Sequence, residues 1–492
     1  MKGMVLVILL VIILSLFSCE AKAQRQLSLD ETISLARMQS VDATVALSEL
    51  KTAYWEYRTH RADMLPEVNF TGTLPSYNKS YSSYQQNDGS YTFVPNNYLG
   101  LSGKLSVDQN IWLTGGKLSL TSSLDYLKQL SSGGTHQYMS VPVGLTLTQP
   151  IFNVNNLKWK RKIEPVRYAE AKAAYIESTE KVTMKAITDF FELLLAKENL
   201  NIARQNLQNA DKLYEIAKAK RTMGQISENE VLQLKLAALK AKGSVTEMES
   251  NLNAKMFQLR SFIGLSEQDK IEPVVPTAVS MMNIDYQTVL DKAHDNNSFA
   301  QNIRRRQLEA DYNVAAAKGA LRNIDLFASV GYTGLNKDFS STYQNLMDNQ
   351  IVQVGVKIPI LDWGKRRGKV KVAESNRAVV VSKIKQEQMD FNQDIFLLVE
   401  HFNNQAMQLN IATEADDIAQ QRYKTSIETF LIGKINTLDL NDAQTSKDDA
   451  RQKHISELYK YWYYYYQIRS LTLFDFQKNT TLDAEFDEIV KK

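Results

Sequence analysis

The sequence falls into two halves that repeat one another, and this duplication restricts the possible folds more than any other feature of the chain. Landmarks in the first half recur 209 positions later, as the difference 359 − 150 between two equivalent prolines shows. The matched landmarks are Pro150 with Pro359, Gly224 with Gly433, Ile226 with Ile435, and Arg260 with Arg469. A constant offset at separated positions indicates an internal duplication, so the chain is expected to fold as two similar units.

Each half is predicted to run in the order helix, strands, very long helix, turn and helix. Upstream of the strands the offset becomes about 257, so the first half carries about 257 − 209 = 48 extra residues. The predicted divisions are a signal peptide over 1–23, a first repeat over 24–264 (helix 29–63, strands within 66–152, long helices over 153–264), an equatorial linker over 265–284, a second repeat over 285–474 (helix 285–321, strands 324–361, long helices 362–472) and a tail over 475–492.

The strand segments alternate between aliphatic residues and small or polar ones. Val352 and Val354 face one way, whereas Gln353 and Gly355 face the other. This pattern suits a lipid-facing barrel wall around a wet lumen, and it suits equally a soluble sheet with one buried face. The first half is expected to hold four strands (68–74, 99–111, 118–126 and 141–151), of which the hairpin near 99–126 is additional, and a loop over 75–98 that is rich in Tyr, Ser and Asn.

The longest helix is predicted over about 70 residues, which corresponds to roughly 105 Å. Its apolar residues step by three and four, as expected of a coiled-coil seam: Leu200, Ala203, Leu207, Ala210, Tyr214 and Ala217. Near the end of the last helix stands the run WYYYY (462–466). Consecutive aromatic residues point all round a helix, so this run is interpreted as packing rather than as a membrane belt or a ligand platform.

The N-terminus is predicted to be an export signal. Lys2 precedes the apolar stretch 4–17, and AKAQ offers a cleavage site after Ala23. The only cysteine, Cys19, gives the alternative of a lipid anchor. About ten residues separate Cys19 from a helix start near Leu29, and they span at most about 35 Å. A lipid would then not reach a bilayer that lies about 50 Å above that start, so cleavage after Ala23 is favoured.

Composition and motifs argue against several functional classes. The 58 basic and 55 acidic residues give a net charge of +3, which makes no case for nucleic-acid binding. The five histidines form no metal-binding motif, and no nucleophile elbow or glycine-rich nucleotide loop occurs. Neither catalysis nor a cofactor or metal is therefore expected.

The order and spacing of these motifs resemble the TolC family of outer-membrane channels, the exit ducts of tripartite efflux pumps and type I secretion systems. The resemblance rests on LTQPIF and VKIPILDWG at the strand-to-helix junctions, the two glycine turns, LRSFIGL and the duplication itself. It implies a mixed membrane protein of a Gram-negative outer membrane: a homotrimer whose protomers share a transmembrane β-barrel, continuous with a long α-helical coiled-coil barrel in the periplasm. The family usually contributes four strands per protomer, so the additional hairpin is a departure.

The resemblance also implies roles for residues at the far end of the long helices. Asp439 and Asp442 are expected to form an acidic ring at the periplasmic entrance, although a solvated acidic face gives the same pattern. The turns at Gly224, Ile226, Gly433 and Ile435 are the expected docking site of a periplasmic adaptor. Glu230 matches an acidic position of the family's closed-state latch, but the partner positions hold Phe430 and Ile435, which puts that latch in doubt.

Two basic clusters follow the strand-to-helix prolines at equivalent places. Because cations oppose the macrodipole at a helix N-terminus, an anion is expected nearby. The phosphates of inner-leaflet lipid at the outer membrane would supply one, and a solvated helix face is the equal alternative. The clusters comprise Lys158, Lys160, Arg161 and Lys162 in the first half, and Lys365, Arg366 and Arg367 in the second.

The leading functional hypothesis is a passive duct, opened by the adaptor and powered by an inner-membrane pump or ABC transporter. The alternative of another class is a surface-anchored coiled-coil adhesin or structural spacer without transport. The latter would need neither paired Pro-Ile junctions nor a duplicated tip turn, which favours the duct.

Overall fold

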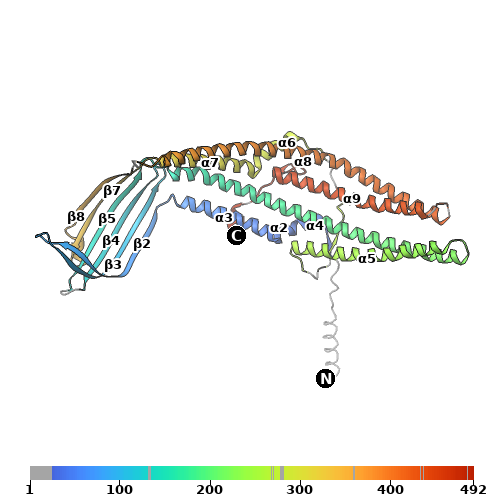
Figure 1. Cartoon of the computed structure of the whole chain (residues 1–492), viewed down its shortest axis with the longest axis horizontal. Coiled ribbons are helices and arrows are strands. Elements are labelled where there is room, and N and C mark those ends of the chain that lie inside the picture. The colour runs from blue at the N-terminus through green and yellow to red at the C-terminus, as the bar shows by residue number, and fades with distance from the viewer. Residues whose placement is uncertain are drawn as a thin grey trace, which may run out of the picture. The chain divides into compact units, whose positions relative to one another are not determined.

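The protein forms two compact units, which we call unit 1 and unit 2 (Figure 1). Unit 1 comprises Met1–Leu50, Lys172–Asn297 and Asp390–Lys492, and unit 2 comprises Lys51–Ala171 and Ser298–Met389. The computed structural model describes residues 25–130, 134–266, 269, 271–276, 282–357, 361–432, 434–435, 437–484 and 486–491. The predicted signal peptide, Cys19, Pro359 and Gly433 lie outside the described residues.

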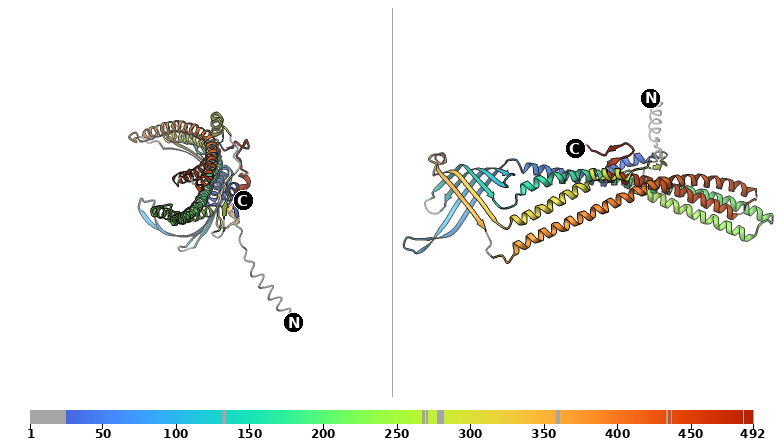
Figure 2. Two further views of the ribbon diagram at one scale, coloured as in Figure 1. Left: turned by 90° about the vertical axis from the view of Figure 1, so that its right-hand side faces the viewer. Right: turned by 90° about the horizontal axis from the view of Figure 1, so that it is seen from above.

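Unit 2 contains a six-stranded antiparallel sheet with the order β2-β3-β4-β5-β7-β8, whose strands lie side by side in Figure 2. Strand β3 is hydrogen-bonded to both β2 and β4, so the additional hairpin of the first half belongs to this sheet. A short 3-10 helix, η1 (Ser340–Tyr343), connects the last two strands. The strands are β2 (Glu67–Gln85), β3 (Tyr91–Ile111), β4 (Gly116–Gln129), β5 (His136–Pro150), β7 (Asn323–Asn336) and β8 (Met347–Lys357).

The prediction of a loop over 75–98 is wrong, because β2 and β3 continue through most of it. Only a tight turn separates them, in which the Gln86 amide donates to the Ser90 carbonyl (2.8 Å) and Gly89 has a positive φ of 82°. Tyrosine has a high strand propensity, and the Tyr-rich stretch pairs residue by residue across the hairpin. Strand β3 pairs with β4 only from Tyr98 onward, so the outer part of the hairpin is a two-stranded ribbon.

The sheet has one aliphatic face and one polar face, as the alternation in the sequence predicted. Cross-strand pairing places Val107, Leu120, Leu145 and Val330 in one row across four strands. The opposite face carries small polar pairs such as Thr146 and Ser329, whose hydroxyl oxygens lie 3.2 Å apart. The large side chains of the aliphatic face, which include Leu105, Leu120, Leu145, Val330, Val352 and Val354, are exposed in the single chain.

The helices repeat the duplication in three dimensions, since the two longest, α4 and α8, both contain 67 residues. Short strands accompany them: β1 (Arg25–Leu27) pairs in parallel with β6 (Ile271–Pro273), and β9 (Phe474–Asp475) pairs with β10 (Thr480–Thr481). The helices are α2 (Leu29–Gln39), α3 (Val41–Ala62), α4 (Asn156–Thr222), α5 (Glu228–Phe262), α6 (Tyr286–Asn296), α7 (Ser298–Gly319), α8 (Lys365–Leu431), α9 (Thr437–Thr472) and α10 (Phe486–Lys491).

The first helix of each half is broken in two, which contradicts the predicted continuous helices 29–63 and 285–321. The breaks fall at Ser40 and Asn297, and 297 − 40 gives the upstream offset of 257. Both residues have extended backbones, and short polar side chains compete with helical hydrogen bonds. The Ser40 hydroxyl accepts from the Ala43 amide (3.1 Å), and the Asn297 amide side chain donates to the Leu471 carbonyl (2.8 Å).

The core of unit 1 lies where α2, α4, α6, α8 and α9 meet, and the tyrosine run forms part of it. Tyr461 and Tyr465 are almost fully buried, and their rings lie 5.2 and 6.3 Å from that of Phe402. The interpretation of this run as packing is confirmed. Leu200, Ala203 and Ala217 of the predicted coiled-coil seam are also buried.

A buried carboxylate joins α8 to α9 and makes the stability of unit 1 depend on pH. Glu457 is 3% exposed. Burial opposes its charge, but hydrogen bonds from Gln405, Lys453 and Lys460 outweigh burial and lower the pKa of the carboxyl from 4.5 to about 2. A lowered carboxyl pKa stabilises the folded state above pH 4.5, and this contribution is lost as the pH falls toward 2.

We therefore expect Glu457→Gln to destabilise the protein at pH 7 by roughly 3 kcal/mol, the free energy that the pKa shift represents. The difference from the wild type should shrink as the pH falls below 4.5, because the carboxyl of the unfolded wild type then takes up a proton while that of the folded protein stays charged until about pH 2. Thermal unfolding followed by circular dichroism between pH 7 and 3 measures it. An equal difference at all pH values would show that packing, not charge, is responsible.

Candidate functional site

The tip of unit 1, where α4 turns into α5 and α8 turns into α9, contains the predicted entrance aspartates and the described residues of the predicted docking turns. Gly224 ends α4 with a φ of 75°, a left-handed conformation that favours glycine. The Gln225 amide donates to the Lys220 carbonyl (2.9 Å), and the Gly224 amide donates to Arg221 (2.9 Å). These two bonds define a Schellman motif. In the second half the Lys434 amide donates to the Thr429 carbonyl (3.0 Å), which is the equivalent bond at the offset of 209.

Glu230 serves to cap α5. Its Oε2 accepts from the Ser227 amide (2.7 Å), and the Glu230 amide donates to the Ser227 hydroxyl (3.2 Å), which forms a capping box. The hydrogen bond from the Ser227 backbone lowers the pKa of the Glu230 carboxyl. This local role explains the acid at position 230 without a latch.

A cavity of about 550 Å³, which we call the tip groove, lies between the two helical hairpins of the tip. Ile226 and Glu230 line it from the first half, and Phe430 and Leu438 line it from the second. Ile435 packs beside it against the small cluster around Tyr423 and Leu440. The two positions that would hold latch partners in the resemblance, 430 and 435, are thus apolar packing residues.

Three apolar side chains at the tip are largely exposed in the single chain. Met223 is 63% exposed, Ile432 66% and Leu438 78%. Adjoining apolar side chains on a surface commonly mark a site where another protein binds. Sequence reasoning singled out the turns but missed these three residues, although each is an apolar residue beside a glycine turn or at a helix start.

The two predicted entrance aspartates lie in the first turns of α9 and have different surroundings. Asp442 forms an ion pair with Arg422 of α8, in which Nη2 and Oδ2 are 2.5 Å apart. Asp439 is exposed at the helix N-terminus, where a carboxylate is favoured by the macrodipole. Arg422 therefore offsets part of the negative charge that the two carboxylates bring to the tip.

Further along the same helices a three-helix clasp holds the hairpins together. Arg451 of α9 pairs with Asp416 of α8 (3.1 Å) and with Glu198 of α4 (3.4 Å). Burial alone would raise the pKa of the Asp416 carboxyl, but hydrogen bonds from Gln420, His454 and Arg451 lower it below its usual value. The clasp fixes the spacing of the hairpins that form the tip groove.

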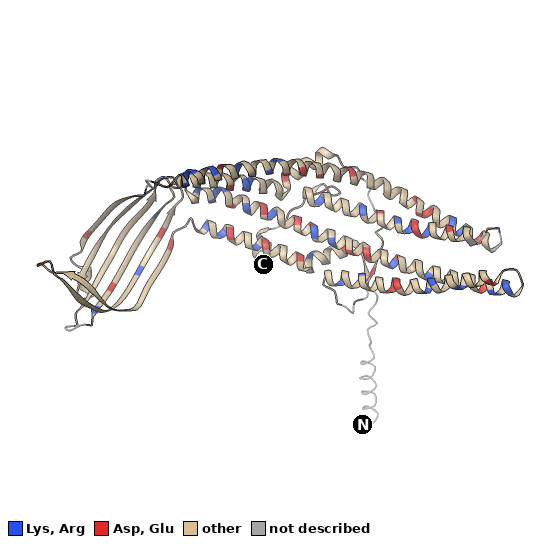
Figure 3. Cartoon of the chain, viewed as in Figure 1, with Lys and Arg blue, Asp and Glu red and all other residues tan. Residues whose placement is uncertain are grey.

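The strand-to-helix junctions of unit 2 hold the two basic clusters, which Figure 3 shows among the charges that follow the helices. Pro150 is the last residue of β5. Arg161 lies over the ring of Trp112 at 4.0 Å, and Arg366 donates to the carbonyls of Ala320 and Leu321 (both 3.1 Å). Lys162 lies 5.2 Å from the Trp159 ring. Several members of the clusters thus have local structural partners.

The anion expected at these helix starts is present in the second half. The Asp362 carboxylate accepts from the amides of Gly364 (3.0 Å) and Arg366 (3.2 Å) and so caps α8. In the first half the Asn155 side chain caps α4 by accepting from the Lys158 amide (2.9 Å). Around these caps the apolar side chains Ile151, Phe152, Leu361 and Trp363 are exposed, Trp363 by 89%.

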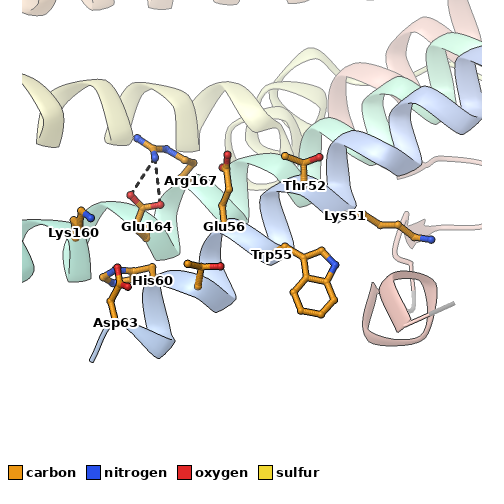
Figure 4. A pocket seen from close by; sticks show the side chains of 10 residues that line it. Lys51, Thr52, Trp55, Glu56, His60, Asp63, Lys160, Glu164 and Arg167 are labelled. Carbon is orange, nitrogen blue, oxygen red and sulfur yellow. Dashed lines mark hydrogen bonds and ion pairs between the residues drawn. The ribbon is translucent and has the colours of Figure 1, made fainter. Parts of the chain in front are cut away.

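A further cavity of about 620 Å³ lies between α3 and α4 in unit 2 (Figure 4). His60 and Trp55 line it from α3, and Glu164 and Arg167 line it from α4. Arg167 pairs with Glu164 (3.1 Å) and with Glu309 (2.9 Å), so charges compensate one another across the helices. Burial lowers the pKa of His60, which favours the neutral imidazole. The arrangement is that of a polar helix seam.

Within the described residues, none of the helices combines the length and the apolar composition that crossing a bilayer requires.

A family model described as "Outer membrane efflux protein" matches residues 115–265 and 289–472. The two matched stretches correspond to the two halves of the duplication. The chain belongs to the outer membrane efflux protein family. The members of this family are outer membrane transport channels rather than enzymes, and the protein is accordingly an outer membrane efflux channel by family. No curated protein sequence matches the chain at a significant level.

Solved structures share the fold of this outer membrane efflux protein at low sequence identity. The CmeC outer membrane channel of Campylobacter jejuni superposes with a TM-score of 0.67 at 14% identity, covering 94% of this chain and 88% of CmeC. The outer membrane protein VceC of Vibrio cholerae gives 0.64 at 15% identity, covering 92% and 97%. The open state of the MtrE outer membrane channel of Neisseria gonorrhoeae gives 0.59 at 14% identity, covering 90% and 88%.

The capping box of Ser227 provides a test of the tip structure. We expect Ser227→Ala to destabilise the start of α5 by about 1 kcal/mol, because it removes a hydrogen bond to an otherwise unpaired helix amide. Hydrogen exchange of the amides of residues 228–232 should accelerate about fivefold. Ser250→Ala, on the exposed middle of the same helix, is the control and should leave these amides unchanged. Equal protection in both variants would contradict the capping role of Ser227.

Proposed function

We propose that the protein is the passive exit duct of a tripartite efflux pump or type I secretion system and works as a homotrimer. The observation that carries this proposal is the six-stranded sheet, which ends in two edge strands, β2 and β8, and exposes its aliphatic face. Edge strands and exposed aliphatic faces require partners. Three copies joined edge to edge would contribute 3 × 6 = 18 strands, enough to enclose an aqueous lumen.

Lipid is the partner that we propose for the aliphatic face. The small polar side chains of the opposite face would then line the lumen, which is the alternation of membrane barrels. Exposed Trp363 and Phe152 at the strand-to-helix junctions suit the inner interface of the membrane. Lysines of the adjoining basic clusters, such as Lys158 and Lys365, would reach inner-leaflet phosphates from there. The pairing of Arg161 and Arg366 within the chain restricts this role to the remaining members.

A periplasmic adaptor is the partner that we propose for the tip. The tip groove offers apolar walls at Ile226, Phe430 and Leu438, and Met223 and Ile432 are exposed at the ends of the adjoining helices α4 and α8. An amphipathic helix of the adaptor would bury these side chains, in the helix-in-groove mode. An inner-membrane pump or ABC transporter would supply the energy, because the sequence carries no glycine-rich nucleotide-binding loop.

Asp439 and Asp442 are proposed to line the periplasmic entrance. In a trimer the two positions would bring six carboxylates together, which favours cations and repels anions. The ion pair between Asp442 and Arg422 ties α8 to α9 at this level, so an adaptor that moves these helices apart would have to break it. Membership of an efflux family weighs against the alternative of an adhesin or spacer.

The proposal predicts small, cation-selective single-channel openings of the purified trimer in a planar bilayer. Asp439→Asn with Asp442→Asn should bring the cation-to-anion permeability ratio down toward one, because the entrance loses its carboxylates. Asp211→Asn with Glu247→Gln removes two exposed carboxylates from α4 and α5 and should leave the ratio unchanged.

If the openings of all three proteins have the same selectivity, the two aspartates belong to a solvated helix face and do not line the entrance. The proposal of a duct is not contradicted by that result. The duct is contradicted if a verified trimer inserts into the bilayer but does not conduct, either as the wild type or as Arg422→Gln, the variant that loosens the tip.

A further inference from the structure

The aliphatic face of the sheet is interrupted at one place by a groove with aromatic walls. The 3-10 helix η1 folds back over this face, where the Ser140 hydroxyl donates to the Thr342 carbonyl (2.9 Å) and is fully buried. Gly334 makes the approach possible, because a Cβ there would lie 1.8 Å from the Thr342 carbonyl oxygen. Loop and sheet together enclose a cavity of about 680 Å³, which we call the rim groove.

The lining of the rim groove is mainly apolar and aromatic, although Ser102, Ser122 and Ser123 also contribute to it. Leu101, Leu105 and Leu124 line it from the sheet. Tyr126 and Tyr138 pair across β4 and β5 with ring centroids 4.9 Å apart, and Phe339 lies 6.0 Å from Tyr138. Its volume lies in the range of sites that hold small ligands or parts of larger ones.

Two basic residues lie beyond one end of the rim groove. Lys128 and His136 pair across β4 and β5 two residues beyond the Tyr126–Tyr138 pair, which is about 7 Å along the strands. Since side chains alternate, both lie on the aliphatic face, whereas Asp125 lies on the opposite one. The Lys128–His136 end is the far end of these strands from the β5–α4 junction at Pro150.

We propose that the rim groove binds a phosphorylated, multiply acylated lipid of the outer leaflet. An acyl chain would lie against the leucines and tyrosines, and the phosphate would meet Lys128 and His136. The apolar chain and the charged phosphate of such a lipid match the two parts of the groove, which is apolar toward the middle of the sheet and basic at its outer end. The groove is also continuous with the aliphatic face for which lipid is the proposed partner, so the inference rests on the proposed function.

The test measures lipid retained by the full-length protein. The trimer is reconstituted in phosphatidylcholine vesicles that contain a minor fraction of a diphosphorylated, multiply acylated glucosamine lipid, then extracted in mild detergent, and the bound lipid is counted by native mass spectrometry. The wild type should retain the phosphorylated lipid and not its dephosphorylated form. Lys128→Gln with His136→Gln should lower retention by about fivefold or more, the ratio that corresponds to about 1 kcal/mol for one basic side chain at a membrane.

Two controls separate the site from general effects. Lys104→Gln removes a charge from the polar face of the same sheet and should retain lipid like the wild type. Gly334→Ala should displace η1 and reduce retention, whereas Gly355→Ala, whose Cβ would make only ordinary contact at 3.7 Å with the Asp325 carbonyl oxygen, should not. Equal loss in Lys104→Gln, unchanged retention in Lys128→Gln with His136→Gln, or equal retention of the dephosphorylated lipid would overturn the proposal.

The same preparation is examined in the planar bilayer. A trimer that inserts and conducts but retains no phosphorylated lipid overturns this inference alone. A trimer that does not insert overturns the proposed function, on which the inference depends.

Discussion

The packing of unit 1 depends on one buried carboxylate, Glu180 of α4, which is 2% exposed. Arg37 of α2 donates to its Oε1 (2.6 Å), and Arg469 of α9 lies within ion-pair distance of its Oε2 (3.2 Å), outside ideal hydrogen-bond geometry. Burial raises the pKa of this carboxyl more than the two arginines lower it. An isolated buried charge is costly, and the loss of one partner of a buried pair typically costs about 3–5 kcal/mol. The position of α4 between α2 and α9 is therefore fixed by electrostatics as well as by apolar packing.

The cluster continues into the C-terminal segment and so distinguishes the two halves of a duplicated chain. Arg469 also pairs with Asp475 of β9 (2.9 Å), which accepts from the Tyr465 hydroxyl (2.8 Å). The equivalent residue of the first half, Arg260, instead donates to the Asp269 carbonyl (3.1 Å). Duplication thus preserved the helix end and its arginine, while the contacts of that arginine diverged. The turns and the helix lengths keep the backbone of the two halves alike, whereas side chains at equivalent positions form different contacts.

Features with a local cause were predictable from the sequence, and features with a long-range cause were not. The turn at Gly224, the seam through Leu200 and Ala203 and the two faces of the sheet follow from spacing and residue type alone. The breaks at Ser40 and Asn297 carry a weaker local signal, because a serine or asparagine is tolerated inside many helices. The rim groove could not be predicted from the sequence, since it depends on a contact between Ser140 and Thr342, which are 202 residues apart. At the tip, the family resemblance pointed to Asp442, but only the fold shows that Arg422 is its partner.

The additional hairpin explains why the strand-to-helix junction of the first half is more elaborate than that of the second. A sheet widened by two strands needs a new attachment to the helices, because the extra turn between β3 and β4 has no helix of its own. That turn is held by Asn155, whose side chain donates to the carbonyls of Trp112 (2.8 Å) and Leu113 (3.1 Å) while it caps α4. Gly115, with a φ of 79°, allows the close approach, and Arg161 stacks on Trp112. One polar side chain thus fixes both the start of the long helix and the base of the inserted hairpin, so the wider sheet and the long helices are joined by the same residue.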